Sequence, residues 1–307
     1  MIHSGSNGLR AGVETGGTKT VVAGLYADAS SNSSEGELAF RESVHTTSPR
    51  DTLDAVTAIL DRHGGGRPYL SLGIGTFGPV RVDAAAADYG RILATPKPGW
   101  TDTDLVRHFD GLAHGSVVVD TDVNAAALAE ATAWGKRGTL AYVTVGTGVG
   151  LGVVRAGRVC HGDTHFEAGH VPVPRAPDDG VASVCPFHAN CIEGMASGPS
   201  WIARYGCTLS ELPLEHGGQA EAAFYLARFC QAVLLMHSPS RVVLGGGVMK
   251  TPGLLDRVRA ELIQGLGGYG PYADTSAFEL VAPLCGDDAG VRGAIALGAL
   301  SRVEANL

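Results

Sequence analysis

The feature that most constrains this chain is a strand–glycine–strand plan that occurs twice. Residues 12–24 and 142–154 each read as an apolar strand, a glycine-rich reversal and a second apolar strand, about 130 residues apart. Two copies of one hairpin predict a duplicated domain with a cleft between the copies, and such clefts are where ligands usually bind. Because strand–glycine–strand segments are common, coincidence remains the alternative explanation.

Helical and extended patterns alternate along the rest of the chain. Apolar spacing predicts helices over residues 49–63, 124–134, 219–236, 254–266 and 290–303. Strands are expected at residues 69–75, 117–120 and 241–244, and a loop or hairpin tip at 28–37. This alternation is typical of the α/β class, and 307 residues predict two domains at about 150 residues per domain.

Composition excludes several classes of protein. A formal charge of −8 argues against a nucleic-acid surface, which needs a basic stripe. Six cysteines are too few for a disulfide scaffold of this length. No apolar run approaches the ~20 residues that span a bilayer, and the first ten residues lack the apolar core of a signal peptide. We therefore expect neither a secreted, a membrane nor a fibrous protein.

Glycine clusters at strand ends suggest a phosphate site. Gly73–Gly78 matches G-x-G-x-x-G, but Pro79 follows where a dinucleotide-binding fold needs a helix, and the chain has no P-loop motif. The clusters that remain are Gly16, Gly17, Thr18 and Lys19; Gly146, Thr147 and Gly148; and Gly245, Gly246 and Gly247. Such turns aim backbone N–H groups at an anion. Each of them alone is also compatible with a plain tight turn.

A second cluster has the composition of a metal site. Cys185, His188 and Cys191 lie within seven residues, and His170 lies fifteen residues upstream of Cys185. Two cysteines and two histidines give the four ligands of a structural zinc site, which leaves no position for a reactive water. The alternative is two free thiols and two surface histidines. A zinc hydrolase is excluded, because the pair His165 and His170 has the wrong spacing for H-E-x-x-H.

Asp122 is the candidate acid–base residue. It follows the predicted strand 117–120 and precedes the alanine-rich helix, where α/β proteins place their ligands. Its carboxylate could accept a proton from a substrate hydroxyl. The same position suits a helix N-cap, which would stabilise the helix by ~1 kcal/mol. Spacing alone does not separate the two roles.

In combination, these motifs resemble a known family. The matching segments, in chain order, are 12–19, 73–79, 95–100, 120–124, 146–150, 167–170, 185–193, 197–200 and 244–249. Together they resemble the bacterial ROK sugar kinases (repressor, open reading frame, kinase), and within them the fructokinase branch, from about residue 11 to the C-terminus. The zinc cluster and the acidic motif are the specific parts; the glycine segments alone would not be.

The resemblance implies an actin/hexokinase-like (ribonuclease H-like) fold of duplicated α/β domains with a central cleft. One lobe would comprise residues 1–119 plus about 290–307, and the other, with the zinc segment, residues 120–289. It implies a kinase that uses ATP and Mg²⁺, with Asp122 as catalytic base and one structural Zn²⁺ on His170, Cys185, His188 and Cys191. ATP would contact Gly16, Gly17, Thr18, Lys19, Thr147, Gly148, Pro199, Gly245, Gly246 and Gly247. The sugar would contact Gly78, Asp122, Glu167, His170 and Glu193.

Two departures from glucokinase-type members favour fructose over glucose. Thr121 replaces an asparagine before the catalytic aspartate, and Cys-Pro-Phe-His at 185–188 replaces their Cys-x-Cys-Gly zinc loop. The expected reaction is transfer from ATP to the 6-hydroxyl of D-fructose, with mannose or glucose as slower substrates. Kinases for glucose or an N-acetylhexosamine, and a sugar-sensing regulator without catalysis, remain alternatives. By resemblance we expect a cytoplasmic homodimer that binds neither nucleic acid nor membrane.

Overall fold

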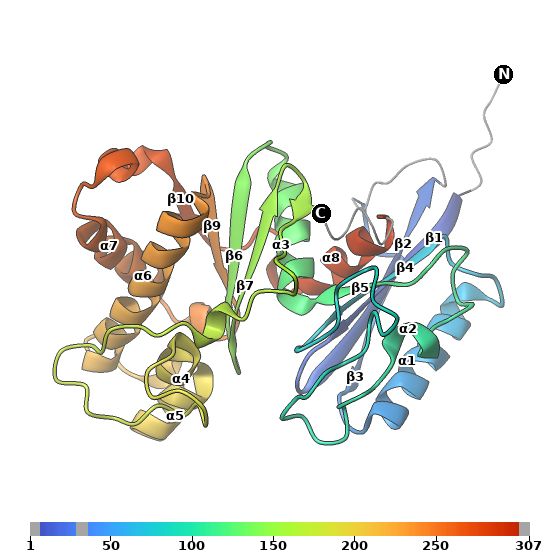
Figure 1. Ribbon diagram of the computed structural model, residues 1–307, viewed down its shortest axis with the longest axis horizontal. Helices are drawn as coiled ribbons and strands as arrows, with labels where there is room; N and C mark the ends of the chain where they lie inside the picture. The colour runs from blue at the N-terminus through green and yellow to red at the C-terminus, as the bar shows by residue number, and fades with distance from the viewer. Residues whose placement is uncertain (1–6, 29–35, 301–307) are drawn as a thin grey trace. The chain divides into compact units, whose positions relative to one another are not determined.

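The computed structural model describes residues 7–28 and 36–300, which form two compact units (Figure 1). Unit 1 comprises residues 1–136, 157–165 and 287–307 of the chain, and unit 2 comprises residues 137–156 and 166–286. The expected boundary after residue 119 comes earlier than the boundary between the units. Residues 120–136 belong to unit 1 because their strand and helix pair and pack there.

A mixed sheet forms the centre of unit 1. Its strands are β1 (Asn7–Thr15), β2 (Lys19–Asp28), β3 (Phe40–His45), β4 (Ser71–Thr76) and β5 (Val118–Thr121), in the order β3-β2-β1-β4-β5. β1 pairs antiparallel with β2 and parallel with β4, and β4 pairs parallel with β5. Strand β3 was not expected from the sequence. Most of the expected loop at 28–37 lies outside the described residues.

Helices cover this sheet: α1 (Pro49–Gly64), the single-turn α2 (Leu105–His108), α3 (Asp122–Trp134) and α8 (Ala289–Gly298). The chain end returns as expected, since α8 packs on β1, β4 and α3. The approach is close enough to require glycine: a Cβ at Gly73 would lie 1.9 Å from the Ala294 carbonyl oxygen, and one at Gly293 would lie 1.7 Å from that of Ala125. Helix α8 ends at Gly298, and residues 301–303 of the expected helix lie outside the described part.

Unit 2 has its own mixed sheet, with β6 (Thr139–Val145), β7 (Val149–Arg155), β9 (Arg241–Gly245) and β10 (Glu279–Val281) in the order β10-β9-β6-β7. The two-residue strand β8 (Arg158–Val159) falls in the segment of unit 1 that follows β7. The helices are α4 (Ile192–Ala196), α5 (Gly198–Tyr205), α6 (Gly217–His237) and α7 (Leu254–Leu266), with α6 and α7 packed side by side (Figure 1).

The two sheets share one topology. In unit 1 the hairpin β1–β2 is followed by the parallel strands β4 and β5; in unit 2 the hairpin β6–β7 is followed by the parallel strands β9 and β10. In both units the first strand of the hairpin pairs with its partner on one side and with the next parallel strand on the other. The repeated hairpin in the sequence is therefore a structural duplication. Among the described residues, no helix has both the length and the apolar character needed to cross a membrane.

Candidate active site

Three parallel strands of unit 1 end in register at one edge of the sheet. Glu14 on β1 is level with Gly75 on β4, which is level with Asp120 on β5. The next level consists of three buried threonines, Thr15, Thr76 and Thr121. The loop 16–19, the loop around Gly78 and the start of α3 all leave from this edge. Because ligands of α/β proteins bind at the carboxyl ends of parallel strands, this edge is the candidate site of unit 1.

Asp122 is the first residue of α3, and it is not the helix cap. Thr121 has extended backbone angles and accepts a hydrogen bond from the Asn124 N–H at 3.2 Å, so Thr121 is the N-cap. The cap interpretation of Asp122 is therefore wrong. The Asp122 carboxylate accepts from the N–H of the next residue, Val123, at 2.8 Å. Burial raises its pKa to about 6, and hydrogen bonds from the backbone N–H groups of Val123 and of Asp122 itself lower it less. A carboxylate with this pKa suits a general base near neutral pH.

A second carboxyl group, Glu14, lies at the same edge. Burial and the negative charge of Asp122 raise its pKa to about 7, while Lys19 and Arg41 act in the opposite direction. Its carboxyl group lies against the first turn of α8, where a Cβ at Gly290 would come within 2.2 Å of the carboxyl carbon. The absence of a side chain at Gly290 therefore leaves room for the Glu14 carboxyl group. Raised pKa values at two neighbouring carboxyl groups, Glu14 and Asp122, are typical of a functional site.

Behind Asp122 lies a buried cluster that the sequence analysis missed. Asp120 is fully buried and accepts from the Thr121 N–H at 2.7 Å and from Asn124 Nδ2 at 2.7 Å. Its other oxygen contacts His161 Nε2 at 2.9 Å, and the His161 side chain is only 5% exposed. Two N–H donors and the contact with His161 surround a carboxylate that would be costly to bury alone. These contacts hold the turn that carries Asp122. Because His161 is 41 residues from Asp120 in sequence, no local pattern could reveal the contact between these two side chains.

The first glycine loop and Gly78 both leave this edge. The loop 16–19 closes with a hydrogen bond from the Gly16 N–H to the Lys19 carbonyl at 3.0 Å, and Gly17, Thr18 and Lys19 are exposed. The Gly78 carbonyl accepts from the Thr95 hydroxyl at 3.3 Å. Unit 1 thus brings together Asp122, the loop 16–19 and Gly78 as the sequence predicted.

In unit 2 the nucleotide-contact candidates meet at the equivalent strand ends. Gly146, after β6, accepts from the Gly198 N–H at 2.7 Å, and this contact places Pro199 in the first turn of α5 beside the β6–β7 turn. Gly246, after β9, has a φ of +92°, and a Cβ there would lie 2.4 Å from the Val145 carbonyl oxygen. Three segments far apart in sequence therefore form one glycine-lined surface: the β6–β7 turn with Thr147 and Gly148, the start of α5, and residues 245–247.

The sugar-contact candidates of unit 2 adjoin this surface. Glu193 on α4 accepts from the Val149 N–H at 3.1 Å, and a Cβ at Gly148 would lie 2.6 Å from its Oε2. Gly169 lies between Glu167 and His170, and a Cβ there would lie 2.0 Å from the Val149 carbonyl oxygen. Glu167 itself is exposed. The end of β7 nearest the glycine turn therefore places the segments of Glu193 and of Glu167 side by side.

The cysteine–histidine cluster forms as expected. The four ligand atoms of His170, Cys185, His188 and Cys191 lie within 4.8 Å of one another. Cys185 Sγ is 3.9 Å from His170 Nδ1 and 3.5 Å from His188 Nδ1. Tetrahedral zinc, with bonds of about 2.3 Å to sulfur and about 2.0 Å to nitrogen, separates its ligands by about 3.3–3.8 Å. The donor set is that of a structural zinc site, and its spacing is within about 1 Å of the spacing around a bound ion.

Zinc at this cluster would brace the sugar-contact candidates. His170 ends the 3₁₀ helix Ala168–His170, which begins directly after Glu167. Cys191 is the N-cap of α4, where its Sγ accepts from the Gly194 N–H at 3.4 Å, and Glu193 lies in the first turn of that helix. Both candidate carboxylates are therefore within three residues of a zinc-ligand candidate. Ligands this close would give the metal a positioning role.

Comparison with known proteins decides the family. A model described as "ROK family" matches residues 10–300. The chain belongs to the ROK family. It is 39% identical over 295 residues to a fructokinase of Zymomonas mobilis, covering 93% of this chain and 94% of that protein. It is 33% identical over 291 residues to a fructokinase of Pediococcus pentosaceus, covering 94% of this chain and 97% of that protein.

Solved structures confirm the hexokinase-like α/β fold of this ROK protein. A ROK hexokinase from Thermus thermophilus matches with a TM-score of 0.73 and 26% identity, over 94% of this chain and 97% of that one. A ROK glucokinase from Streptomyces griseus, solved in complex with glucose and AMPPNP, matches with a TM-score of 0.74 and 25% identity, over 95% of this chain and 99% of that one.

A buried ion pair fastens the loop that precedes the zinc-ligand cysteines of this ROK chain. Asp179 and Arg204 are each only 1% exposed and are joined at 2.7 Å. The Tyr225 hydroxyl also donates to Asp179, and it accepts from the Ala176 N–H at 3.0 Å. Burial raises the pKa of Asp179, but the hydrogen bonds from Arg204 and Tyr225 outweigh it and hold this pKa at about 2. The pair therefore ties the loop to α5 and α6.

We expect Asp179→Asn to lower the free energy of unfolding by about 3–5 kcal/mol, because it leaves the Arg204 charge buried and poorly paired. Since the folded-state pKa is depressed, the contribution of Asp179 is present above its ordinary pKa of 3.8 and is lost as the pH falls through about 2. Urea unfolding at pH 7 measures the change, with the exposed neighbour Asp178→Asn as control. Equal losses in the two variants would contradict the assignment.

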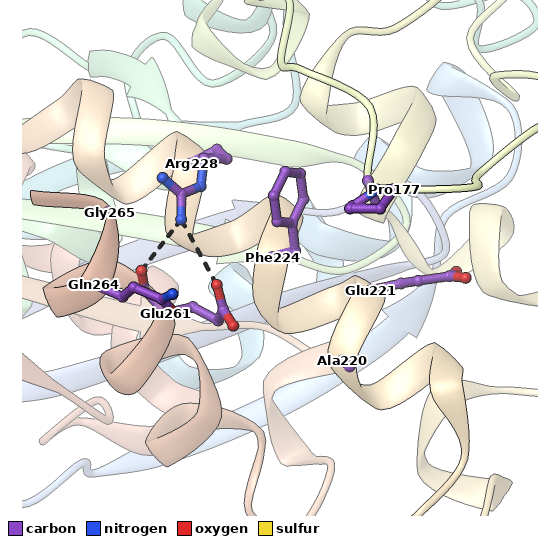
Figure 2. Close-up of a pocket in the computed structure, with 9 residues that line it drawn as sticks. Pro177, Ala220, Glu221, Phe224, Arg228, Glu261, Gln264 and Gly265 are labelled. Atoms are coloured by element: carbon purple, nitrogen blue, oxygen red, sulfur yellow. Dashed lines mark hydrogen bonds and ion pairs between the residues drawn. The ribbon is translucent and has the colours of Figure 1, made fainter.

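Unit 2 of the ROK chain also contains an open cavity of about 560 Å³ between α6, α7 and the loop at 176–177 (Figure 2). Arg228 lies in it, donates to the Glu261 carbonyl at 3.3 Å and pairs with the Glu261 carboxylate at 3.6 Å. None of its lining residues is among the site residues predicted from the sequence. The cavity therefore shares no residue with the candidate site.

Proposed function

We propose that this ROK protein is an ATP-dependent sugar kinase that phosphorylates D-fructose at its 6-hydroxyl. The observation that carries the proposal is the environment of Asp122. Its carboxyl group has a raised pKa and does not cap α3, because Thr121 is the N-cap. It lies at the ends of three parallel strands, beside a glycine loop that contains a lysine. The names of the curated relatives support fructose as the substrate. Mannose is the expected slower substrate.

In this proposal Asp122 takes the proton of the attacking hydroxyl. The oxygen of that hydroxyl bonds to the γ-phosphorus, the bond from this phosphorus to the β,γ-bridging oxygen breaks, and the electron pair leaves on ADP. Catalysis is then mainly positioning and charge neutralisation. The Asp120–His161–Asn124 contacts hold Asp122 in place, and Gly78 follows the end of β4 at the same edge of unit 1.

The phosphates of ATP would be bound by backbone N–H groups and by one lysine of the first loop. The candidate donors of the first loop are Gly16, Gly17, Thr18 and Lys19, and those of the second loop are Thr147 and Gly148. Pro199 and residues 245–247 would border the rest of the nucleotide. Mg²⁺, which accompanies ATP in phosphoryl transfer, supplies neutralisation of phosphate charge.

Glu167, His170 and Glu193 would bind sugar hydroxyls, and zinc on the four-residue cluster would keep their segments in shape. Four protein ligands leave no open coordination position, so the metal has no chemical step of its own. Hydrogen bonds to particular hydroxyls can discriminate between sugars by orders of magnitude, which is how such a site would select fructose. We also propose, from the family resemblance, that the protein is a cytoplasmic homodimer, which sedimentation velocity and cell fractionation would test.

The direct test is a coupled assay of ADP release with fructose, mannose, glucose and N-acetylglucosamine. We expect kcat/KM for fructose to exceed that for each other sugar by at least about 10-fold, the scale of a lost hydroxyl contact. Phosphorus NMR of the product identifies the phosphorylated hydroxyl. A higher kcat/KM for glucose or N-acetylglucosamine would show that this sugar, and not fructose, is the preferred substrate. No ADP release with any sugar would favour a non-catalytic regulator.

A further inference from the structure

Lys97 reaches the first glycine loop from a distant part of the chain. Its ammonium group donates a hydrogen bond to the carbonyl of Gly17, which is 80 residues away in sequence. The chain contains only four lysines among its 23 basic residues, and two of them, Lys19 and Lys97, are thus at this loop. Such a concentration of a rare residue at an exposed turn calls for an explanation.

The backbone holds Lys97 in this position firmly. Trp100 is fully buried, donates from Nε1 to the Thr47 carbonyl at 2.9 Å and packs edge-on against Phe77 with ring centroids 5.0 Å apart. At the other end of the loop, the Thr95 hydroxyl donates to the Gly78 carbonyl at 3.3 Å. Prolines on both sides of Lys97 restrict the backbone further. The loop that carries Lys97 therefore has a fixed backbone, and this backbone places the ammonium group beside Gly17.

The surroundings of Lys97 suit an anion. Within residues 7–28 and 36–300, neither Lys97 nor Lys19 forms an ion pair with a carboxylate. An ammonium group has three N–H donors, and the Gly17 carbonyl takes one of them. The loop beside it is exposed at Gly17 and Thr18. Two donors of a positive charge are thus left at the turn whose N–H groups are the phosphate-binding candidates.

We propose that Lys97 is a second phosphoryl-binding lysine, which binds the terminal phosphoryl group of the nucleotide while it passes to the sugar. The inference rests on the proposed kinase function. The sugar oxygen still bonds to the γ-phosphorus as the bond to the β,γ-bridging oxygen breaks, and Asp122 still takes the hydroxyl proton. Lys97 forms and breaks no covalent bond and gives up no proton; its ammonium group donates hydrogen bonds to the phosphoryl oxygens, whose charge it offsets. The competing role is a structural tether of Gly17 alone.

The small number of lysines permits a direct binding test on the wild-type protein. Surface lysines are acetylated briefly and quantified by mass spectrometry, without ligand, with fructose, with ADP, and with AMPPNP plus fructose. We expect AMPPNP to slow acetylation of Lys97 at least about 10-fold, ADP to slow it much less, and fructose alone to leave it unchanged. Lys136 and Lys250 serve as internal controls. Equal labelling of Lys97 with AMPPNP and with ADP would overturn the proposal.

Variants separate phosphoryl binding from tethering. We expect Lys97→Met to lower kcat at least about 10²-fold, the range for losing one preorganised donor, with KM for fructose within about 2-fold. Lys97→Arg, which keeps the charge, should recover part of the loss, and the control Lys136→Met should turn over like wild type. A Lys97→Met protein with wild-type kcat but a lowered melting temperature would show a tether and overturn the proposal. Absence of ADP release by the wild type would instead refute the kinase function itself.

Discussion

Asp122→Asn is expected to lower kcat by at least about 10²-fold, the range for losing a general base, while the KM for fructose and for ATP changes little. Asparagine keeps the shape of the side chain and can still contact the Val123 N–H, but it cannot accept a proton. Steady-state ADP release measures the change. The exposed Asp110→Asn is the matched control, because it removes the same charge from unit 1 away from the strand ends.

The same variant should be more stable than the wild type at pH 8. Since the folded-state pKa of Asp122 is raised from 3.8 to about 6, burial disfavours its ionised form. In the wild type, the contribution of protonated Asp122 to the free energy of unfolding is fully present below its ordinary pKa of 3.8. This contribution is lost as the pH rises through about 6. Asparagine avoids that loss. Allowing for the partial exposure of Asp122, we expect a gain of about 1–2 kcal/mol in the free energy of unfolding at pH 8.

Stability and activity together distinguish a base from a structural residue. A lost helix cap would cost ~1 kcal/mol, the opposite sign to the gain expected here. In the wild type, kcat/KM should fall as the pH is lowered through about 6, where Asp122 becomes protonated. A variant that keeps more than half of wild-type turnover, or that unfolds more easily at pH 8, would remove Asp122 from the proposed mechanism.

Loss of zinc is the second change from which we expect a large effect. We expect about one zinc ion per chain in protein purified without added metal, and loss of that zinc in Cys185→Ala and Cys191→Ala. Because zinc binding is coupled to the folding of its segment, a chelator should lower the melting temperature by about 5 °C or more. Elemental analysis and calorimetry make the two measurements.

Cys207→Ala is the matched control for the zinc variants. Cys207 is a free cysteine of the same unit outside the cluster, so its loss should leave the zinc content unchanged. Glu193 and Glu167 adjoin the cluster, so chelation should raise the KM for fructose more than the KM for ATP. A metal-free preparation, or a disulfide between Cys185 and Cys191, would contradict the zinc assignment.

Local patterns in the sequence predicted much of this protein. The two hairpins, the bounds of α7 and the start of α1 at Pro49 follow from apolar periodicity and capping, which involve residues close together in the chain. The four zinc-ligand candidates were recognisable because three of them lie within seven residues. Asp122 was recognisable as a candidate because it stands between a strand and a helix.

Only the tertiary structure decided which neighbour caps α3 and which distant groups surround Asp122. Threonine and aspartate are both good caps, so the choice of Thr121 depended on the backbone angles that its pairing in β5 imposes. His161 and Lys97 reach their partners Asp120 and Gly17 over 41 and 80 residues. Periodicity and spacing report contacts within a few turns of the chain, whereas these pairs exist only because folding brings separate segments to the same edge of one sheet.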